Sequence, residues 1–495
     1  MTDLTTNVLL LAALGLLGWG FYRARPLGTL GILAWLQSVA LMAPWLLLFG
    51  LMSAGIPVNL AGILFLLLGS VALYIYLGRR LRSLASQTLP SSASRTASPS
   101  AIANAADPSP ATPPLVETAN PESDQHPIPA DDLQILKGIF GIDTFFATET
   151  IPYQDGAIFK GNLRGDPEQV WQTLNQKMEA ALSNQYRLFL VPNPEEKPVV
   201  IVLPNRNDPT PSTLTQRLLA VGLGVATLIT CCATAGFLLQ VDLLAHLERL
   251  PATLPLGLGL FSILIVHEVG HQVMARRHGV RFSWPFFLPA LQLGSFGALN
   301  RFESLCPSRK VLFDIAFAGP AAGGLYSLGL LIIGLVLSTP DSLFKVPSIF
   351  FQGSILVGTL ARVVLGDALH EATVGVSPLM VMGWMGLVIT ALNLMPAGQL
   401  DGGRVVQSIY GRKVAGRTTI VTLVFLGIAS FVNPLALYWA AIILILQRDL
   451  ERPSLNELTE PDDARAALAL LALFLTITVL VPLTPSLAGR LGIGL

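Results

Sequence analysis

Long apolar runs dominate this sequence. A helix needs about 17 to 25 predominantly apolar residues to cross a bilayer. Runs near that length occur at residues 7–22, 29–52, 58–78, 214–240, 256–275, 311–337, 379–398, 416–432, 434–447 and 465–486. The chain is 52% hydrophobic and only 13% charged, which is about half the charged fraction of a soluble domain. The sequence therefore predicts an all-α polytopic membrane protein with about ten transmembrane helices in contact with the lipid bilayer.

One boundary between the predicted spans has two interpretations. Asn433 and Pro434 separate the runs at 416–432 and 434–447. This dipeptide is typical of either a tight turn or a kink within one long bent helix. At the start of the chain, the first run is not predicted to be a cleavable signal, because Asp3 precedes it in place of a positive region and further spans follow at once.

Basic residues cluster at the ends of several apolar runs. By the positive-inside rule, these ends face the cytoplasm and the N-terminus faces outward. The residues concerned are Arg23, Arg25, Arg79, Arg80, Arg82, Arg276, Arg277, Arg309, Lys310, Arg404, Arg412, Lys413 and Arg417. The 31 basic and 31 acidic residues give a net charge of zero, so nucleic acid is not an expected partner.

Composition divides the chain into four regions. Residues 1–82 are predicted to form an N-terminal three-span membrane region, and residues 83–130, rich in Ser, Ala, Pro and Thr, a disordered linker. Residues 131–207 have a globular composition, and residues 208–495 hold the remaining spans. Because the 131–207 region follows the basic end of the third span, it is predicted to be a small cytoplasmic α+β domain.

Short apolar runs and one capped helix define the predicted α+β domain. Strands are expected at 145–150, 157–162, 186–191 and 199–203. The segment from Gly161 to Gly165 is interpreted as a strand-to-helix turn, with a binding loop as the alternative. Asp166 is the expected N-cap and Pro167 the first residue of a helix. The buried stripe of that helix is predicted to be Val170, Trp171, Leu174, Met178, Ala181 and Leu182.

Three ionisable residues interrupt the apolar run at 256–275. His267, Glu268 and His271 form a His-Glu-x-x-His pattern. Since a helix has 3.6 residues per turn, the two histidines project from one face and can bind a metal, while Glu268 lies beside them as a general base. Ionisable side chains are costly at membrane depth. This cost favours a catalytic metal site over the alternative, a chance match on a buried helix.

Asp401 is the candidate for a third metal ligand. A catalytic zinc usually has three protein ligands and one open position. Pro396 and the glycines after it break the helix predicted at 379–398, which allows the acid to turn inward. By the charge pattern, this helix and the motif helix both end on the cytoplasmic side, so the two motifs share a membrane depth. The alternative role for Asp401 is a helix-terminal turn.

Four further polar residues carry weaker signals. Asn393 either hydrogen-bonds the substrate or the oxyanion, or serves helix packing. His278 follows the basic end of the motif helix and is interpreted as an interfacial residue. Asp314 either supports the metal site or is a helix-start carboxylate stabilised by the dipole. His370 has no second histidine four residues on, so no metal site is predicted there.

Residues 282–305 are too interrupted by proline and glycine to form a span. Pro285, Pro289, Gly294 and Gly297 lie there among aromatic and apolar residues. The segment is either an ordinary interfacial loop or a re-entrant hairpin near the active site whose edge adds a substrate strand. A substrate that is itself a membrane helix hides its peptide bonds in intrahelical hydrogen bonds, so it must be unwound before hydrolysis.

These residues resemble the site-2 protease family of intramembrane zinc metalloproteases. The resemblance is carried by His267-Glu268-Val269-Gly270-His271 and by the pattern Asn393, Pro396, Leu400-Asp401-Gly402. It looks closest to the plastid and cyanobacterial branch of ethylene-dependent gravitropism-deficient and yellow-green proteins, since 161–165, 294–298 and 318–320 are also similar. The resemblance covers roughly residues 131–490. The three N-terminal spans depart from that branch.

The resemblance implies one Zn²⁺ ion bound by His267, His271 and Asp401, with Glu268 catalytic. It also implies that the 282–305 hairpin, with Gly294 and Gly297, presents the substrate, and that the protein is in a plasma or thylakoid membrane. The charge pattern predicts that the site faces the cytoplasm. The expected partners are membrane-anchored protein substrates, and a homo-oligomer is left open. The alternative function is an inactive metal-binding membrane chaperone or a metal transporter, which would gain nothing from the general base.

Overall fold

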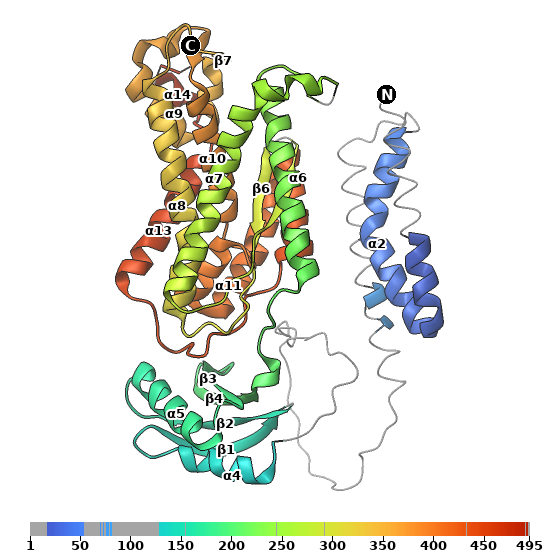
Figure 1. Cartoon of the computed structure of the whole chain (residues 1–495), viewed down its shortest axis with the longest axis vertical. Coiled ribbons are helices and arrows are strands. Elements are labelled where there is room, and N and C mark those ends of the chain that lie inside the picture. Colours follow the sequence, from blue (N-terminus) through green and yellow to red (C-terminus); the bar gives the residue numbers. More distant parts are fainter. Residues whose placement is uncertain are drawn as a thin grey trace, which may run out of the picture. The chain divides into compact units, whose positions relative to one another are not determined.

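The computed structural model of the chain describes residues 17–53, 70, 73, 76–78, 80–81 and 128–495, except residues 154, 244, 292, 432, 491, 494 and 495. The chain divides into two compact units, Met1–Ala119 and Asn120–Leu495 (Figure 1). The larger unit carries every candidate site residue.

The smaller unit is helical where it is described. Residues 17–24 are helical, and they are followed by the 3-10 turn η1 (Arg25–Leu27) and the helix α2 (Gly28–Ser53). The helix α2 coincides with the apolar run predicted at 29–52. Most of the spans predicted at 7–22 and 58–78, and of the linker predicted at 83–130, lies outside the described residues.

The larger unit begins with an antiparallel sheet covered by two helices. Its elements are α4 (Ala130–Ile139), β1 (Phe145–Tyr153), β2 (Gly156–Leu163), α5 (Pro167–Leu182), β3 (Tyr186–Pro192) and β4 (Pro198–Pro204). The strand order is β1-β2-β4-β3. The four predicted strands and the predicted helix are present. Helix α4 was not predicted, because only Leu136 and Ile139 are buried in its 10 residues, too few to make a clear helical period.

Helix α5 begins where the sequence predicts. The Asp166 side chain accepts hydrogen bonds from the backbone N–H groups of Glu168 and Gln169, which satisfies two of the free donors at the helix start. In the predicted stripe, Trp171 is only half-buried and Ala181 is exposed. The residues buried against the sheet are Val170, Leu174, Met178 and Leu182.

The glycines at 161–165 have a structural explanation. Gly161 lies in β2 opposite Ala147 of β1, and a Cβ added there would lie 2.2 Å from the Phe146 carbonyl oxygen. Gly165 has φ 99° immediately before the N-cap of α5, a backbone conformation that favours glycine. The interpretation as a strand-to-helix turn therefore agrees with the structure.

Among the described residues, four helical segments are long and apolar enough to cross a membrane. They are α6 (Leu214–Leu238), the segment Leu247–Arg277, α8 (Arg309–Val336) and α13 (Asp463–Leu480). The second of these consists of the 3-10 turn η3 (Leu247–Arg249) and the helix α7 (Leu250–Arg277). The prediction of a mostly helical membrane protein is confirmed.

The helices after residue 377 are shorter than the predicted spans, or begin elsewhere. Helix α10 (Pro378–Asn393) ends before Pro396, which cannot continue a helix. Helix α11 (Asp401–Ala429) bends at Gly411, where φ is 80°. Asn433 then caps α12 (Pro434–Ile442), which continues as the π-helical turn η6 (Ile443–Gln447). The runs at 416–432 and 434–447 are thus two helices, and the number of about ten spans stays a prediction.

Helices α7 and α8 pack side by side in the larger unit, with α6 against α7 and α10 against α8 (Figure 1). A Cβ added to Gly270 of α7 would lie 2.5 Å from the Ala318 carbonyl oxygen of α8. The two backbones are therefore in direct contact, which small residues permit between membrane helices.

Residues 282–305 form a hairpin. Strands β5 (Phe286–Ala290) and β6 (Gly294–Leu299) pair antiparallel and lie along α6 (Figure 1). Two hydroxyls of α6 hold the turn: Thr230 donates to the Gly294 carbonyl at 2.5 Å and Thr234 to the Leu291 carbonyl at 2.9 Å. The hairpin is present as predicted, whereas its re-entry into a membrane stays a prediction.

Short elements complete the larger unit. The turn η2 (Asn205–Asn207) follows β4, and the connection between α8 and α10 contains a second two-stranded sheet. That connection consists of β7 (Phe344–Pro347), η4 (Ser348–Gly353), α9 (Ile355–Leu365), η5 (Gly366–His370) and β8 (Thr373–Val376). The last helix is α14 (Pro485–Arg490).

The segment 448–460, between η6 and α13, joins the sheet to the helices. Leu190 of β3 donates its N–H to the Leu455 carbonyl at 2.8 Å and accepts from the Glu457 N–H at 2.9 Å, while the Leu455 N–H donates to the Cys306 carbonyl at 2.9 Å. Burial raises the pKa of the Glu457 carboxyl and raises the pKa of the Cys306 thiol to about 12. Both groups are thus shielded from water at this junction.

Replacing Gly161 by alanine is expected to destabilise the sheet by about 1–3 kcal/mol, because the added methyl group forces the backbones of β1 and β2 apart. Thermal unfolding of the purified full-length protein measures the effect. The control is Gly138→Ala in α4, where nothing lies within 4 Å of the added Cβ and helix propensity predicts a small gain. Equal stability of the two variants would contradict this account of Gly161.

Candidate active site and metal centre

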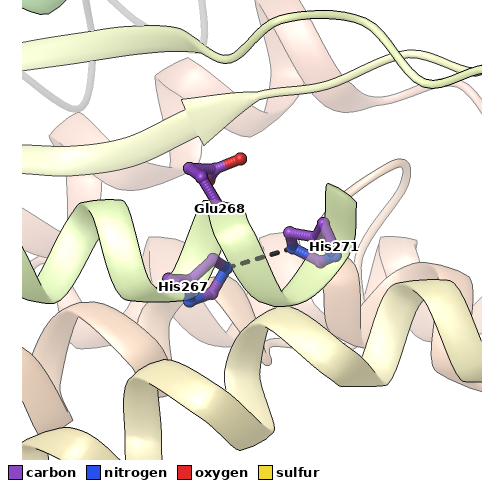
Figure 2. Close-up of side chains that lie close together, drawn as sticks. All are labelled: His267, Glu268 and His271. Carbon is purple, nitrogen blue, oxygen red and sulfur yellow. Dashed lines mark hydrogen bonds between the residues drawn. The ribbon is translucent and has the colours of Figure 1, made fainter. Parts of the chain in front are cut away.

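The motif helix α7 holds its three ionisable residues in a buried environment. His267, Glu268 and His271 are 8%, 5% and 0% exposed, and one donor atom from each lies within 4.8 Å of the others. Figure 2 shows Glu268 pointing toward a strand that runs beside α7, while the histidines lie on the side of a neighbouring helix. The helix thus directs the two histidines and the glutamate to different partners.

Helix α11 brings Asp401 to the two histidines. The Asp401 Oδ2 atom lies 3.1 Å from His267 Nε2, and its Oδ1 atom lies 3.3 Å from His271 Nε2. A Cβ added to Gly402 would lie 1.9 Å from the Leu394 carbonyl oxygen, so the start of α11 packs directly on the loop at 394–400. The broken helix therefore delivers the acid to the site, as the sequence suggested.

The spacing of these donor atoms fits a tetrahedral zinc site. The two histidine Nε2 atoms are 3.2 Å apart, close to their distances of 3.1 and 3.3 Å from the Asp401 oxygens. Zinc bonds of about 2.0–2.2 Å at tetrahedral angles place neighbouring ligand atoms about 3.3–3.6 Å apart. Each Nε2 atom therefore lies within a few tenths of an ångström of this spacing from the other Nε2 atom and from one Asp401 oxygen, so the residues present fit a zinc ion.

Helix α8 sets the orientation of His271. The His271 Nδ1 atom lies 2.7 Å from the Ile315 carbonyl oxygen. A carbonyl only accepts hydrogen bonds, so Nδ1 carries the proton and Nε2 keeps a lone pair for a metal. Gly319 leaves the space that the ring occupies, since a Cβ there would lie 2.1 Å from His271 Nε2.

Glu268 has a partner that the sequence analysis missed. Asn300, which follows the last residue of β6, donates from Nδ2 to Glu268 Oε2 at 2.7 Å. A single asparagine in a loop 32 residues after the motif carries no spacing signal. The sequence analysis pointed to the surroundings of Asn300 only through the expectation that the 282–305 segment lies near the motif.

A buried ion pair holds Asn300 in place. Arg404 of α11 is 2% exposed, pairs with Glu451 at 2.9 Å and donates to the Asn300 carbonyl at 2.6 Å. Its guanidinium also lies 5.3 Å from the centre of the Phe302 ring. The sequence analysis used Arg404 and Arg309 only as basic residues that mark the cytoplasmic side, and it did not predict that both are buried.

The candidate substrate-binding residues lie between β6 and α10. Asn393 is 6% exposed and donates from Nδ2 to the Phe296 carbonyl of β6 at 3.3 Å. A Cβ added to Gly297 would lie 2.6 Å from that Nδ2 atom. Gly294, with φ 81° at the hairpin turn, packs against Cys231 of α6. All three have a packing role, and their contact with a substrate stays a prediction.

The weaker candidates interact elsewhere. His278 Nε2 lies 3.2 Å from Asp314 Oδ2, and Arg465 of α13 donates two hydrogen bonds of 2.7 Å to the same carboxylate. Asp314 is therefore explained as the partner of Arg465. A Cβ added to Gly492 would lie 2.3 Å from His370 Nε2, so His370 packs against the C-terminal segment.

The fold and the site together define a metallopeptidase built into apolar helices. Residues 256–433 match the model of peptidase family M50, and residues 134–209 match the EGY3 middle domain. No solved structure matches the chain.

Curated relatives from Arabidopsis thaliana extend the match beyond the motif. The protein named "Probable zinc metalloprotease EGY2, chloroplastic" is 39% identical over 373 residues, which cover 73% of this chain and 67% of the relative. "Probable zinc metalloprotease EGY1, chloroplastic" is 37% identical over 425 residues, covering 77% and 76%. "Probable zinc metallopeptidase EGY3, chloroplastic" is 33% identical, covering 68% and 63%.

The chain belongs to peptidase family M50. The predicted resemblance to the site-2 proteases and to their ethylene-dependent gravitropism-deficient branch is confirmed, and with it the prediction of a zinc metalloprotease. The alternative of a metal transporter or an inactive chaperone is not favoured by this membership.

Replacing Gly319 by alanine is expected to lower the affinity for zinc by about 10- to 100-fold, because the added methyl group displaces the His271 ring. Zinc content at limiting metal, measured on the purified protein, tests this. The control is Gly329→Ala in the same helix, where nothing lies within 4 Å of the added Cβ. If both variants hold as much zinc as the unmodified protein, the close approach of α8 to His271 is not needed.

Proposed function

We propose that the chain is an intramembrane zinc endopeptidase that hydrolyses peptide bonds in or near the transmembrane segments of membrane-anchored proteins. One observation carries the proposal: the His267 and His271 Nε2 atoms lie 3.2 Å apart, and each lies within 3.3 Å of one Asp401 oxygen, beside the Glu268 carboxylate. Two of the elements involved, α7 and α8, are apolar enough to cross a membrane. Membership of peptidase family M50 supports the same reaction.

His267, His271 and Asp401 would hold one Zn²⁺ ion. When bound, the ion supplies a Lewis acid that lowers the pKa of water and polarises a peptide carbonyl. The Ile315 carbonyl keeps the His271 ring in the tautomer that can act as a ligand. All three side chains are almost fully buried, so the site excludes bulk water and strengthens electrostatic interactions within it.

Glu268 acts first as a general base and then as a general acid. Its carboxylate takes a proton from the attacking water and passes it to the nitrogen of the leaving amine. The hydrogen bond from Asn300 fixes the orientation of this carboxylate. Asn393, which donates to the Phe296 carbonyl of β6, also hydrogen-bonds the substrate.

The hairpin β5–β6 presents the substrate. Strand β6 is hydrogen-bonded to β5 on one edge, and the two strands form a sheet of their own among the described residues. An unwound substrate segment can add to the free edge through main-chain hydrogen bonds. Gly294 and Gly297 keep the hairpin close to α6 and to Asn393. The packing of the hairpin along α6 supports a re-entrant position in the membrane.

The proposed location is a plasma or thylakoid membrane of the cyanobacterial type, with the site toward the cytoplasm. The Arabidopsis relatives are named chloroplastic. Arg276 and Arg277 close the motif helix as exposed residues, which favours a cytoplasmic position for that end.

The Glu268→Gln variant is expected to lose cleavage of a model transmembrane substrate by at least about 100-fold, because glutamine cannot transfer the proton. Zinc content should be unchanged, since the proposed ligands remain. Product formation in detergent micelles and metal analysis on the same preparation measure the two effects. Glu248→Gln, an exposed glutamate of η3 just before α7, is the matched control and should cleave normally. A Glu268→Gln variant that still cleaved would remove the proposed function.

The Asp401→Ala variant is expected to lose bound zinc, because a two-histidine site lacks the third ligand of a catalytic zinc centre. Metal analysis after dialysis against a mild chelator measures this loss. The Asp314→Ala variant is the control, because that carboxylate pairs with Arg465 and should be dispensable for zinc. Unchanged zinc in Asp401→Ala would exclude this residue from the ligand set.

A further inference from the structure

We propose that Asn300 is a catalytic residue whose side-chain Oδ1 accepts a hydrogen bond from the N–H of the scissile peptide, while its Nδ2 positions the Glu268 carboxylate. The inference rests on the proposed function as a peptide hydrolase. The side-chain amide of Asn300 would then do two things. It orients the Glu268 carboxylate, and it binds the N–H of the scissile peptide, whose nitrogen becomes the leaving amine.

The orientation of the Asn300 amide is fixed by its neighbour. The Asn300 Nδ2 atom lies 2.7 Å from Glu268 Oε2. An ionised carboxylate only accepts hydrogen bonds, so the donor half of the amide must face Glu268. The acceptor half, Oδ1, therefore lies beside the base and faces a different direction.

The Asn300 Oδ1 atom is buried and has no hydrogen-bond partner among the described residues. A buried acceptor without a partner is unfavourable, and natural proteins rarely keep one without a functional reason. Here the unpaired acceptor belongs to the same planar amide that touches the catalytic base. A donor supplied by the substrate satisfies it.

The backbone of Asn300 is held rigidly. Its carbonyl accepts from the guanidinium of Arg404 at 2.6 Å, and Arg404 is fixed by its buried ion pair with Glu451. Arg404 follows Asp401 by three residues in α11, so the helix that supplies the acid of the metal group also anchors Asn300. Because β6 ends at Leu299, Asn300 continues the strand that presents the substrate.

The chemistry of the leaving nitrogen explains why an acceptor is needed there. During hydrolysis, water adds its oxygen to the carbonyl carbon, its proton passes through Glu268 to the nitrogen, and the carbon–nitrogen bond breaks to give an acid and an amine. The nitrogen must turn its lone pair toward Glu268 to receive that proton. Oδ1 of Asn300 holds the existing N–H to one side, which orients the lone pair toward the carboxylate.

The test compares two synthetic transmembrane peptides that differ at the scissile bond. The cut site is first located by mass spectrometry. One peptide then has the natural amide at this bond, and the other has an ester, which lacks the N–H. The enzymes are the unmodified protein, Asn300→Ala, Asn300→Asp and the control Asn175→Ala. Asn175 also donates from Nδ2 to a glutamate, Glu179, at 3.0 Å, but on the exposed face of α5.

Asn300→Ala is expected to keep its zinc and to lose about 10- to 100-fold in kcat on the amide peptide, with a smaller change in KM. On the ester peptide the loss should be about two- to tenfold smaller, because only the positioning of Glu268 is then removed. Asn300→Asp should also lose kcat, because its carboxylate repels Glu268. Asn175→Ala should match the unmodified enzyme on both peptides.

The outcomes separate this inference from the proposed function. Cleavage by Glu268→Gln in the same assay would overturn the proposed function itself. If Glu268→Gln is inactive, two results for Asn300→Ala with full zinc would overturn the role of Asn300. One is a normal kcat, and the other is an equal loss of kcat on the amide and ester peptides. If Asn300→Ala loses zinc, the test relies on Asn300→Asp, because this variant keeps the shape of the side chain. A normal kcat of Asn300→Asp would overturn the proposal, and a reduced kcat with full zinc would support it.

Discussion

The close approach of α7 and α8 is the constraint on which the site depends. Gly270 of α7 lies against the Ala318 carbonyl, and Gly319 and Gly323 of α8 leave space for the rings of His271 and His267. Larger side chains at these positions would move α8 outward and remove the Ile315 carbonyl from His271. The pairing of the two backbones therefore sets both the place and the tautomer of the imidazole ring, before any ligand outside these two helices is considered.

A second requirement is that polar groups buried among apolar helices have partners. An unpaired charge in such surroundings is strongly unfavourable. Arg404 meets this requirement with Glu451, the Asn300 carbonyl and the Phe302 ring. Because Arg404 and Asp401 share one helix, a displacement of α11 would disturb the contacts of Asp401 with the two histidines and the partner of Glu268 together. Helix α11 thus couples the position of Asp401 to that of Asn300, the partner of Glu268.

Local patterns in the sequence predicted what depends on local geometry. The spacing of His267, Glu268 and His271 and the cap at Asp166 are set within one or two helical turns, and both are present. The approach of Asp401 to the histidines was predicted because Pro396 marks a helix break. Asn300 and the buried state of Arg404 were missed, because both depend on how a loop packs against distant helices. The bounds predicted for the later spans were wrong for a related reason: α10 ends at Asn393 within the run at 379–398, and α11 begins at Asp401, ahead of the run at 416–432.

The hairpin explains how extended backbone can exist beside apolar helices. Backbone polar groups in a membrane must be paired, buried in protein or in contact with a water-filled cavity. Hydroxyls of Thr230 and Thr234 pair with the turn of the hairpin, and β5 pairs with one edge of β6. Asn393 of α10 also pairs with the Phe296 carbonyl of β6. If a substrate segment adds to β6 as proposed, its pairing with the strand replaces the hydrogen bonds that the unwound helix loses.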